Sequence, residues 1–169
     1  GGVECFEAEH HETLPMESEK MFPDYSIYPE YKYAVSMTSR GCPRGCAFCH
    51  VAAKEGRCSV KVADVSDFWN GQQDIQVLDP NITACREKRD LFRQYRATGS
   101  RICFNQGLDI RLLDDDDIDD LNHMRLKDVH FAWDNPRVDL TKQFENYAKK
   151  SKRTLHGSYG TVYILTNYN

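Results

Sequence analysis

The stretch "YAVSMTSRGCPRGCAFCH", residues 33–50, places an apolar, β-prone run directly before a loop that contains three cysteines. The run at 33–38 has the composition of a buried or half-buried strand. Four similar runs follow along the chain, so the sequence predicts five strands. They are "YAVSMT" (33–38), "DIQVLD" (74–79), "RICFNQ" (101–106), "DVHFAW" (128–133) and "TVYILTN" (161–167).

The stretches between these runs carry apolar side chains at helical spacing. We expect helical structure over residues 64–70, 86–97, 114–125 and 139–153. The third stretch begins with four aspartates and has Arg125 and Lys127 near its end, which suits the helix dipole. Strands that alternate with helices predict an α/β fold, in which a parallel sheet is covered by outer helices and the crossovers are right-handed.

The order of the elements predicts an incomplete (β/α) barrel, although an open doubly wound sheet has the same pattern. The chain stops shortly after the fifth expected strand, so we expect a barrel that is truncated there, with a strand edge that a second chain could complete. Residues 1–31 lack a clear period and hold three of the six prolines. We expect them to form an irregular N-terminal arm, with residues 32–169 as the core.

The composition is that of an ordinary soluble protein. Of 169 residues, 40% are hydrophobic and 28% are charged, and the net charge is −4. This charge makes nucleic acid an unlikely partner, although a local basic patch is still possible. The sequence has no apolar run near the roughly 18 residues of a membrane span. Since it also lacks the features of a secretory signal, we expect a cytoplasmic protein without a membrane partner.

The clustered cysteines predict a metal site. Seven cysteines are present, and an odd count without a secretory signal disfavours a disulfide framework. Cys42, Cys46 and Cys49 follow the spacing Cys-x3-Cys-x2-Cys. A structural zinc ion normally takes four protein ligands, so His50 or Cys58 would have to be the fourth. An iron–sulfur cubane on three thiolates fits the loop better, because it leaves one iron open for an external ligand.

Polar residues follow each expected strand. In parallel α/β folds, binding and chemistry gather at the carboxyl ends of the strands, so these side chains are expected to line one pocket. A cap or a turn is the alternative role for each of them, and Arg111 could simply pair with Asp109. The candidates are Asp79, Asn81, Asn105, Gln106, Asp109, Arg111, Asp134, Asn135 and Asn167.

The motif "GCPRGCAFCH" (41–50) resembles the signature of radical S-adenosylmethionine (radical SAM) enzymes. From about residue 25 to 169, the chain is similar to uncharacterised prokaryotic and phage members, with runs such as "FNQGLDIRLL" and "HFAWDNP" at strand ends. The resemblance implies a partial (β/α) barrel of the radical SAM type. It also implies a 4Fe-4S cluster on Cys42, Cys46 and Cys49, with S-adenosyl-L-methionine chelated to the fourth iron.

The resemblance further implies reductive cleavage of S-adenosylmethionine to a 5′-deoxyadenosyl radical, which takes a hydrogen atom from a substrate that the sequence does not identify. A one-electron donor such as flavodoxin or ferredoxin would supply the electron. Phe48 would pack near the adenine. The Gly-Gly-Glu motif that holds the methionyl amine in the family is absent, and Asp79 and Asn81 of "LDPN" are the expected substitutes.

Further side chains complete the cofactor-binding set that the resemblance implies. Asp109 and Arg111 would grip the carboxylate, the ribose or the substrate, since arginine makes paired, charge-assisted bonds with carboxylates. The remaining members of the set are Asn105, Gln106, Asp134 and Asn167.

Two other functions stay open at this point. A non-catalytic zinc or iron–sulfur module that recognises a partner would take its fourth ligand from Cys58 or His50. A radical enzyme that acts on RNA, as methylthiotransferases do, would typically carry a further cluster-binding domain and an RNA-binding domain. The sequence offers neither of these domains.

Overall fold

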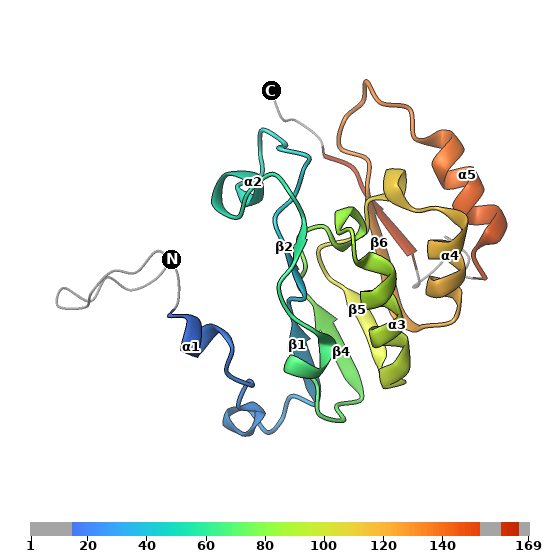
Figure 1. Cartoon of the computed structure of the whole chain (residues 1–169). Coiled ribbons are helices and arrows are strands. Elements are labelled where there is room, and N and C mark those ends of the chain that lie inside the picture. Colours follow the sequence, from blue (N-terminus) through green and yellow to red (C-terminus); the bar gives the residue numbers. More distant parts are fainter. Residues whose placement is uncertain (1–14, 153–159, 166–169) are drawn as a thin grey trace.

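The computed structural model describes residues 15–152 and 160–165. At its centre lies a sheet of five strands in the order β1-β4-β5-β6-β7, and every neighbouring pair is parallel (Figure 1). The five strands predicted from the sequence are therefore confirmed. They are β1 (Tyr33–Ser36), β4 (Asp74–Val77), β5 (Arg101–Phe104), β6 (Arg125–Ala132) and β7 (Gly160–Tyr163).

Three helices form one layer beside this sheet, in which α3 contacts α4 and α4 contacts α5 (Figure 1). They are α3 (Lys88–Thr98), α4 (Asp115–Asn122) and α5 (Thr141–Lys150), as the sequence predicts. The expected helix at 64–70 is instead the single 3-10 turn η2 (Val65–Asp67), because the backbone leaves the helical conformation at Phe68, whose φ is −124°. Among the described residues, no helix has both the length and the apolar character that crossing a bilayer requires.

Aromatic rings fill the space between the sheet and the helices. Phe104 of β5 contacts Phe92 and Tyr95 of α3, with both ring centroids 5.9 Å away. Phe131 of β6 meets Tyr147 of α5 at 4.9 Å. These side chains are almost fully buried, so their apolar surface supplies much of the driving force for docking the helix layer on the sheet.

A tyrosine attaches the arm to the edge of the sheet. The arm contains the short helix α1 (Met16–Glu19) and the 3-10 turn η1 (Tyr25–Ile27). The hydroxyl of Tyr25 accepts a hydrogen bond from the N–H of Val35 at 3.0 Å and donates to the carbonyl of Phe68 at 2.8 Å. The arm therefore contacts β1, an edge strand of the five-stranded sheet.

The segment between β1 and β4 contains elements that the sequence did not predict. Two very short strands, β2 (Ser39–Arg40) and β3 (Val60–Lys61), form an antiparallel pair. The one-turn helix α2 (Val51–Lys54) lies between them. Two 3-10 turns follow the next strands, η3 (Ile82–Ala84) after β4 and η4 (Ile110–Leu112) after β5.

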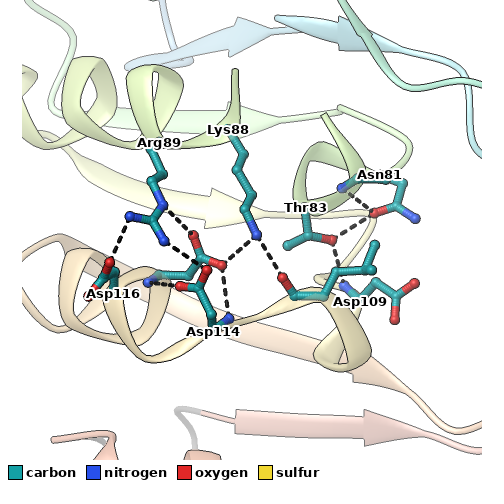
Figure 2. A network of polar contacts seen from close by, with 10 residues as sticks. Asn81, Thr83, Lys88, Arg89, Asp109, Asp114 and Asp116 are labelled. Atoms are coloured by element: carbon teal, nitrogen blue, oxygen red, sulfur yellow. Dashed lines mark hydrogen bonds and ion pairs between the residues drawn. The ribbon is translucent and has the colours of Figure 1, made fainter. Parts of the chain in front are cut away.

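A buried ion pair fixes α3 against the start of α4. The Nζ of Lys88 lies 2.5 Å from a carboxylate oxygen of Asp117, whose side chain is fully buried. Lys88 also donates to the carbonyl of Leu112 at 2.7 Å, so the same side chain holds the end of η4. Beside it, Arg89 bridges two aspartates at the start of α4, as Figure 2 shows; these are Asp114 and Asp116.

We predict that Lys88→Met lowers the free energy of unfolding by about 3 kcal/mol, because it leaves a buried carboxylate without its main partner. The loss should stay at the low end of the range for such pairs, since Arg89 remains 3.8 Å from the other oxygen of Asp117. Urea denaturation measures this. The double variant Lys88→Met/Asp117→Asn should recover part of the loss, and a double variant less stable than the single one would contradict the prediction.

Candidate functional site

The three clustered cysteines lie on a loop, residues 41–59, that we call the cysteine loop. β2 and β3 close its base, and the N–H of Cys42 donates to the carbonyl of Gly56 at 3.1 Å. Gly41 has a φ of +86°, and a Cβ there would lie 2.0 Å from the carbonyl oxygen of Cys58. A side chain at this position would therefore collide with the opposite limb of the loop. The closed loop projects beyond the carboxyl end of β1 (Figure 1).

Asp79, just beyond β4, fastens the base of the cysteine loop to the sheet. Its carboxylate accepts hydrogen bonds from the N–H groups of Thr38 and Ser39 at 3.0 and 2.5 Å, and from their hydroxyls at 2.8 and 2.6 Å. The residue is 2% exposed, and this burial raises its pKa although the hydrogen bonds from Ser39 and Thr38 oppose the rise. Both carboxylate oxygens are engaged, so these contacts assign Asp79 a supporting role; its expected contact with the methionyl amine stays a prediction.

Asn81 contacts the first cysteine of the motif. Its Nδ2 donates to the Sγ of Cys42 at 3.5 Å. Its Oδ1 accepts from the hydroxyl of Thr83 at 2.7 Å and from the N–H of Ala84 at 3.2 Å, and so caps η3. The side chain is thus fixed between the end of β4 and the cysteine loop.

Asp109, just beyond β5, brings two arginines together. Its carboxylate lies 2.5 Å from the Nε of Arg44 and 2.6 Å from the Nε of Arg111. Burial alone would raise the pKa of Asp109, but the hydrogen bonds and charges of Arg111 and Arg44 outweigh it and lower that pKa below its usual value. The ion pair between Arg111 and Asp109, which the sequence left open, is present. Arg44 belongs to the cysteine loop, so its ion pair with Asp109 connects this loop to the segment between β5 and η4.

A cavity of about 470 Å³ lies between the cysteine loop and the segment after β6, and we call it the strand-end cavity. Its volume is typical of small-molecule sites, which span roughly 300–1,000 Å³. Five residues singled out from the sequence meet there, namely Cys46, Phe48, Arg111, Asp134 and Asn135. The other lining residues are Arg44, Ala47, Ala132, Trp133, Pro136, Val138 and Leu140.

The three thiols lie close enough to influence one another. Burial raises the pKa of the Cys46 thiol, and the charges of Cys42 and Cys49 raise it further, whereas Arg111 opposes the rise. The six cysteines in the described part of the chain are free. Within residues 15–152 and 160–165, no three His, Cys, Asp or Glu side chains are gathered as they would be around a single metal ion.

The remaining candidates lie elsewhere. Asn105 donates to the Oε1 of Gln76 at 2.9 Å and accepts from the thiol of Cys103 at 3.1 Å, so its amide is used within the sheet. Gln106 is exposed, and neither it nor Asn105 lines the strand-end cavity. Asn167 lies outside the described residues.

Both alternative fourth metal ligands are exposed on the cysteine loop. His50 directly precedes α2, and Cys58 directly precedes the buried Ser59 near the base of the loop. Their side chains are therefore accessible, and the choice between an open iron and a protein-derived fourth ligand needs a direct test.

Two site residues were missed in the sequence. Arg44 lies inside the motif "CPRGC", and a basic residue between two candidate metal ligands is the sequence signal for its role. Trp133 borders the strand-end cavity, and its Nε1 donates to the carbonyl of Val138 at 2.8 Å. This hydrogen bond folds the segment after β6 into one wall of the cavity.

The site combines three kinds of chemistry: clustered thiols, a pair of guanidinium groups held on a carboxylate, and aromatic walls. Thiolates are the ligands that soft metal centres prefer, and guanidinium groups bind anionic groups of organic ligands. In comparisons with known proteins, no family model and no curated protein matches the chain.

We predict that Asp79→Asn lowers the free energy of unfolding by about 2 kcal/mol at neutral pH, because the new amide turns an N–H group toward the donors of Ser39. The pH profile gives a second check. A carboxyl whose folded pKa is raised favours the folded state as it takes up a proton. The wild type should therefore gain stability as the pH falls through that pKa toward the ordinary value of 3.8, and the variant should lack this gain.

Urea denaturation across the acid range measures both effects of the Asp79→Asn change. The gap between wild type and variant should widen on acidification. A gap that narrows, or a variant as stable as the wild type at neutral pH, would show that the carboxylate does not support the loop in this way.

Proposed function

We propose that this chain is a radical SAM enzyme with a partial (β/α) barrel core. The three motif cysteines would hold a 4Fe-4S cluster, and S-adenosyl-L-methionine would bind in the strand-end cavity. One observation carries the proposal: Cys46 and Phe48 of the motif line the same cavity as Arg111 and Asp134, which follow two different strands. The substrate is left unassigned.

The strand order supports a barrel rather than a doubly wound sheet. A doubly wound sheet reverses its strand order and carries helices on both faces. Here the order runs in one direction from β1 to β7, and α3, α4 and α5 form a single layer. The carboxyl ends of all five parallel strands consequently lie along one edge, where the cysteine loop begins.

The donor set suits the cluster. Thiolates are the ligands that iron–sulfur clusters take, and three of them from one loop leave an iron free for an external ligand. When bound and reduced, the cluster would supply the electron that breaks a carbon–sulfur bond of S-adenosylmethionine, which gives methionine and the 5′-deoxyadenosyl radical that takes a hydrogen atom from the substrate. The chain itself contributes a loop whose base is held by Asp79 and whose first thiol contacts Asn81.

The strand-end cavity offers a contact for each part of S-adenosylmethionine. Arg44 and Arg111 bring two positive charges against the single charge of Asp109, so the excess suits the methionyl carboxylate. The carboxylate of Asp134 suits an ammonium group or ribose hydroxyls. Phe48, which is 40% exposed, presents an aromatic surface for the adenine.

The proposed chemistry also requires an electron donor and a reducing compartment. A one-electron donor such as flavodoxin or ferredoxin has to transfer its electron to the cluster. Cys49 is exposed, so a cluster bound to it would lie near the protein surface, where the donor can approach. We place the enzyme in the cytoplasm, where a reducing environment keeps its thiols available for the cluster.

Anaerobic reconstitution with iron and sulfide tests the proposal. We expect about four irons per chain, as a cubane requires, and an EPR spectrum of the reduced protein that changes when S-adenosylmethionine is added. Reduced protein should then form 5′-deoxyadenosine. Each of the variants Cys42→Ser, Cys46→Ser and Cys49→Ser should fail to assemble the cluster.

Cys58→Ser is the matched control, because it removes an exposed thiol from the same loop. It should retain the cluster and its response to S-adenosylmethionine. Stoichiometric zinc in place of iron, or a cluster that Cys58→Ser or His50→Ala abolishes, would instead support a non-catalytic metal-binding module.

We further predict that Arg111→Met weakens the binding of S-adenosylmethionine to the reconstituted protein. A hydrogen bond to a charged group is worth about 1.5–3 kcal/mol, so the dissociation constant should rise roughly ten- to hundredfold. Calorimetric titration measures it. Arg93→Met removes an exposed arginine from α3 and should bind S-adenosylmethionine with the affinity of the wild type. Equal dissociation constants for the two variants would show that Arg111 does not bind S-adenosylmethionine.

A further inference from the structure

The side-chain amide of Asn81 reaches Cys42 from a position 39 residues further along the chain. Its Nδ2 lies 3.5 Å from the Sγ of Cys42, and Asn81 is only 6% exposed. Its Oδ1 accepts two hydrogen bonds, from Thr83 and from Ala84. Turning the amide over would direct its N–H groups at these two donors, so the donor end stays aimed at the sulfur.

Thr83 locks this arrangement. It is 3% exposed, and its hydroxyl donates to the Oδ1 of Asn81 at 2.7 Å while it accepts from the N–H of Asp109 at 3.1 Å (Figure 2). A hydroxyl has a single proton, and the Asp109 N–H can only donate, so the proton is committed to Asn81. A chain of hydrogen bonds thus leads from the thiol of Cys42 through Asn81 and Thr83 to the backbone N–H of Asp109, the residue whose carboxylate holds Arg44 and Arg111.

We propose that Asn81 is a positioning residue that stabilises negative charge on the sulfur of Cys42, and that Thr83 orients it. This inference rests on the proposed function and deepens it, because it commits the Asn81 amide to the cluster ligand rather than to the methionyl amine. Hydrogen bonds to ligand sulfur favour the more electron-rich state of an iron–sulfur centre and secure its ligands. Asn81 therefore raises the reduction potential of the cluster and slows its loss.

Asn81→Asp is the sharpest variant, because it keeps the oxygen that caps η3 and replaces the donor with an oxygen facing the sulfur. We expect the midpoint potential, measured by an EPR-monitored redox titration, to shift to a more negative value. Iron loss to a chelator should become roughly tenfold faster, as for other changes around metal ligands. The added carboxylate also lowers the potential by its charge alone, so the uncharged Thr83 variants below test the hydrogen bond itself.

Thr83 provides a second, independent variant. Thr83→Val keeps the shape of the side chain but loses its hydroxyl, so we expect a smaller shift of the midpoint potential toward negative values. Thr83→Ser retains the hydroxyl and should have the wild-type potential. Asn70→Asp is the matched control, since it makes the same chemical change at an exposed position before the amino end of β4. It should leave both measurements unchanged.

The outcomes separate the two proposals. A wild-type cluster that responds to S-adenosylmethionine, together with Asn81→Asp and Thr83→Val variants at the wild-type potential, would overturn this inference and leave the proposed function standing. A wild-type chain that assembles no 4Fe-4S cluster would overturn both. If Asn81→Asp does not fold, as judged by circular dichroism, the Thr83→Val and Thr83→Ser pair decides.

Discussion

The placement of the cysteine loop depends on one buried carboxylate. Asp79 lies at the end of β4, and the chain leaving β1 wraps its N–H and hydroxyl groups around it. Burying a carboxylate is costly unless its oxygens are hydrogen-bonded, and here four donors from Thr38 and Ser39 offset part of the cost. The loop that follows therefore leaves the sheet from a fixed point, although β2 and β3 at its base pair over only two residues each.

A second carboxylate holds the same loop through a different kind of contact. Asp79 meets only neutral donors, so burial dominates and its pKa rises. Asp109 meets two guanidinium groups, so its pKa falls and it stays charged. The first contact fixes where the loop begins, and the second fixes Arg44 within it. Together they hold the cysteine loop so that Cys46 lines the strand-end cavity.

The five strands of the central sheet and the helices α3, α4 and α5 were predictable because each is encoded locally, by apolar runs or by helical spacing. The contacts that build the site were harder to predict, because they join distant residues. Arg44 and Asp109 are 65 positions apart, and Thr38 and Asp79 are 41 apart. In the sequence, every polar residue after a strand looks alike, yet Asn81 contacts a thiol whereas Asn105 bonds to Gln76 on the neighbouring strand. The tertiary arrangement of strands and loops, which the local sequence does not encode, decides between these two outcomes.

The charges around the strand-end cavity set the kind of ligand that it can hold. Arg44 and Arg111 share one carboxylate behind them, which leaves about one positive charge at the loop side. Asp134 contributes a negative charge from the segment after β6. A ligand that carries both an anionic and a cationic group can pair with the arginines and with Asp134 at the same time. A simple anion or a simple cation leaves one of these charges unpaired, which weakens its binding. The amino-acid part of S-adenosylmethionine carries both groups, so under the proposed function the ion pairs that hold the cysteine loop in place would also favour its binding.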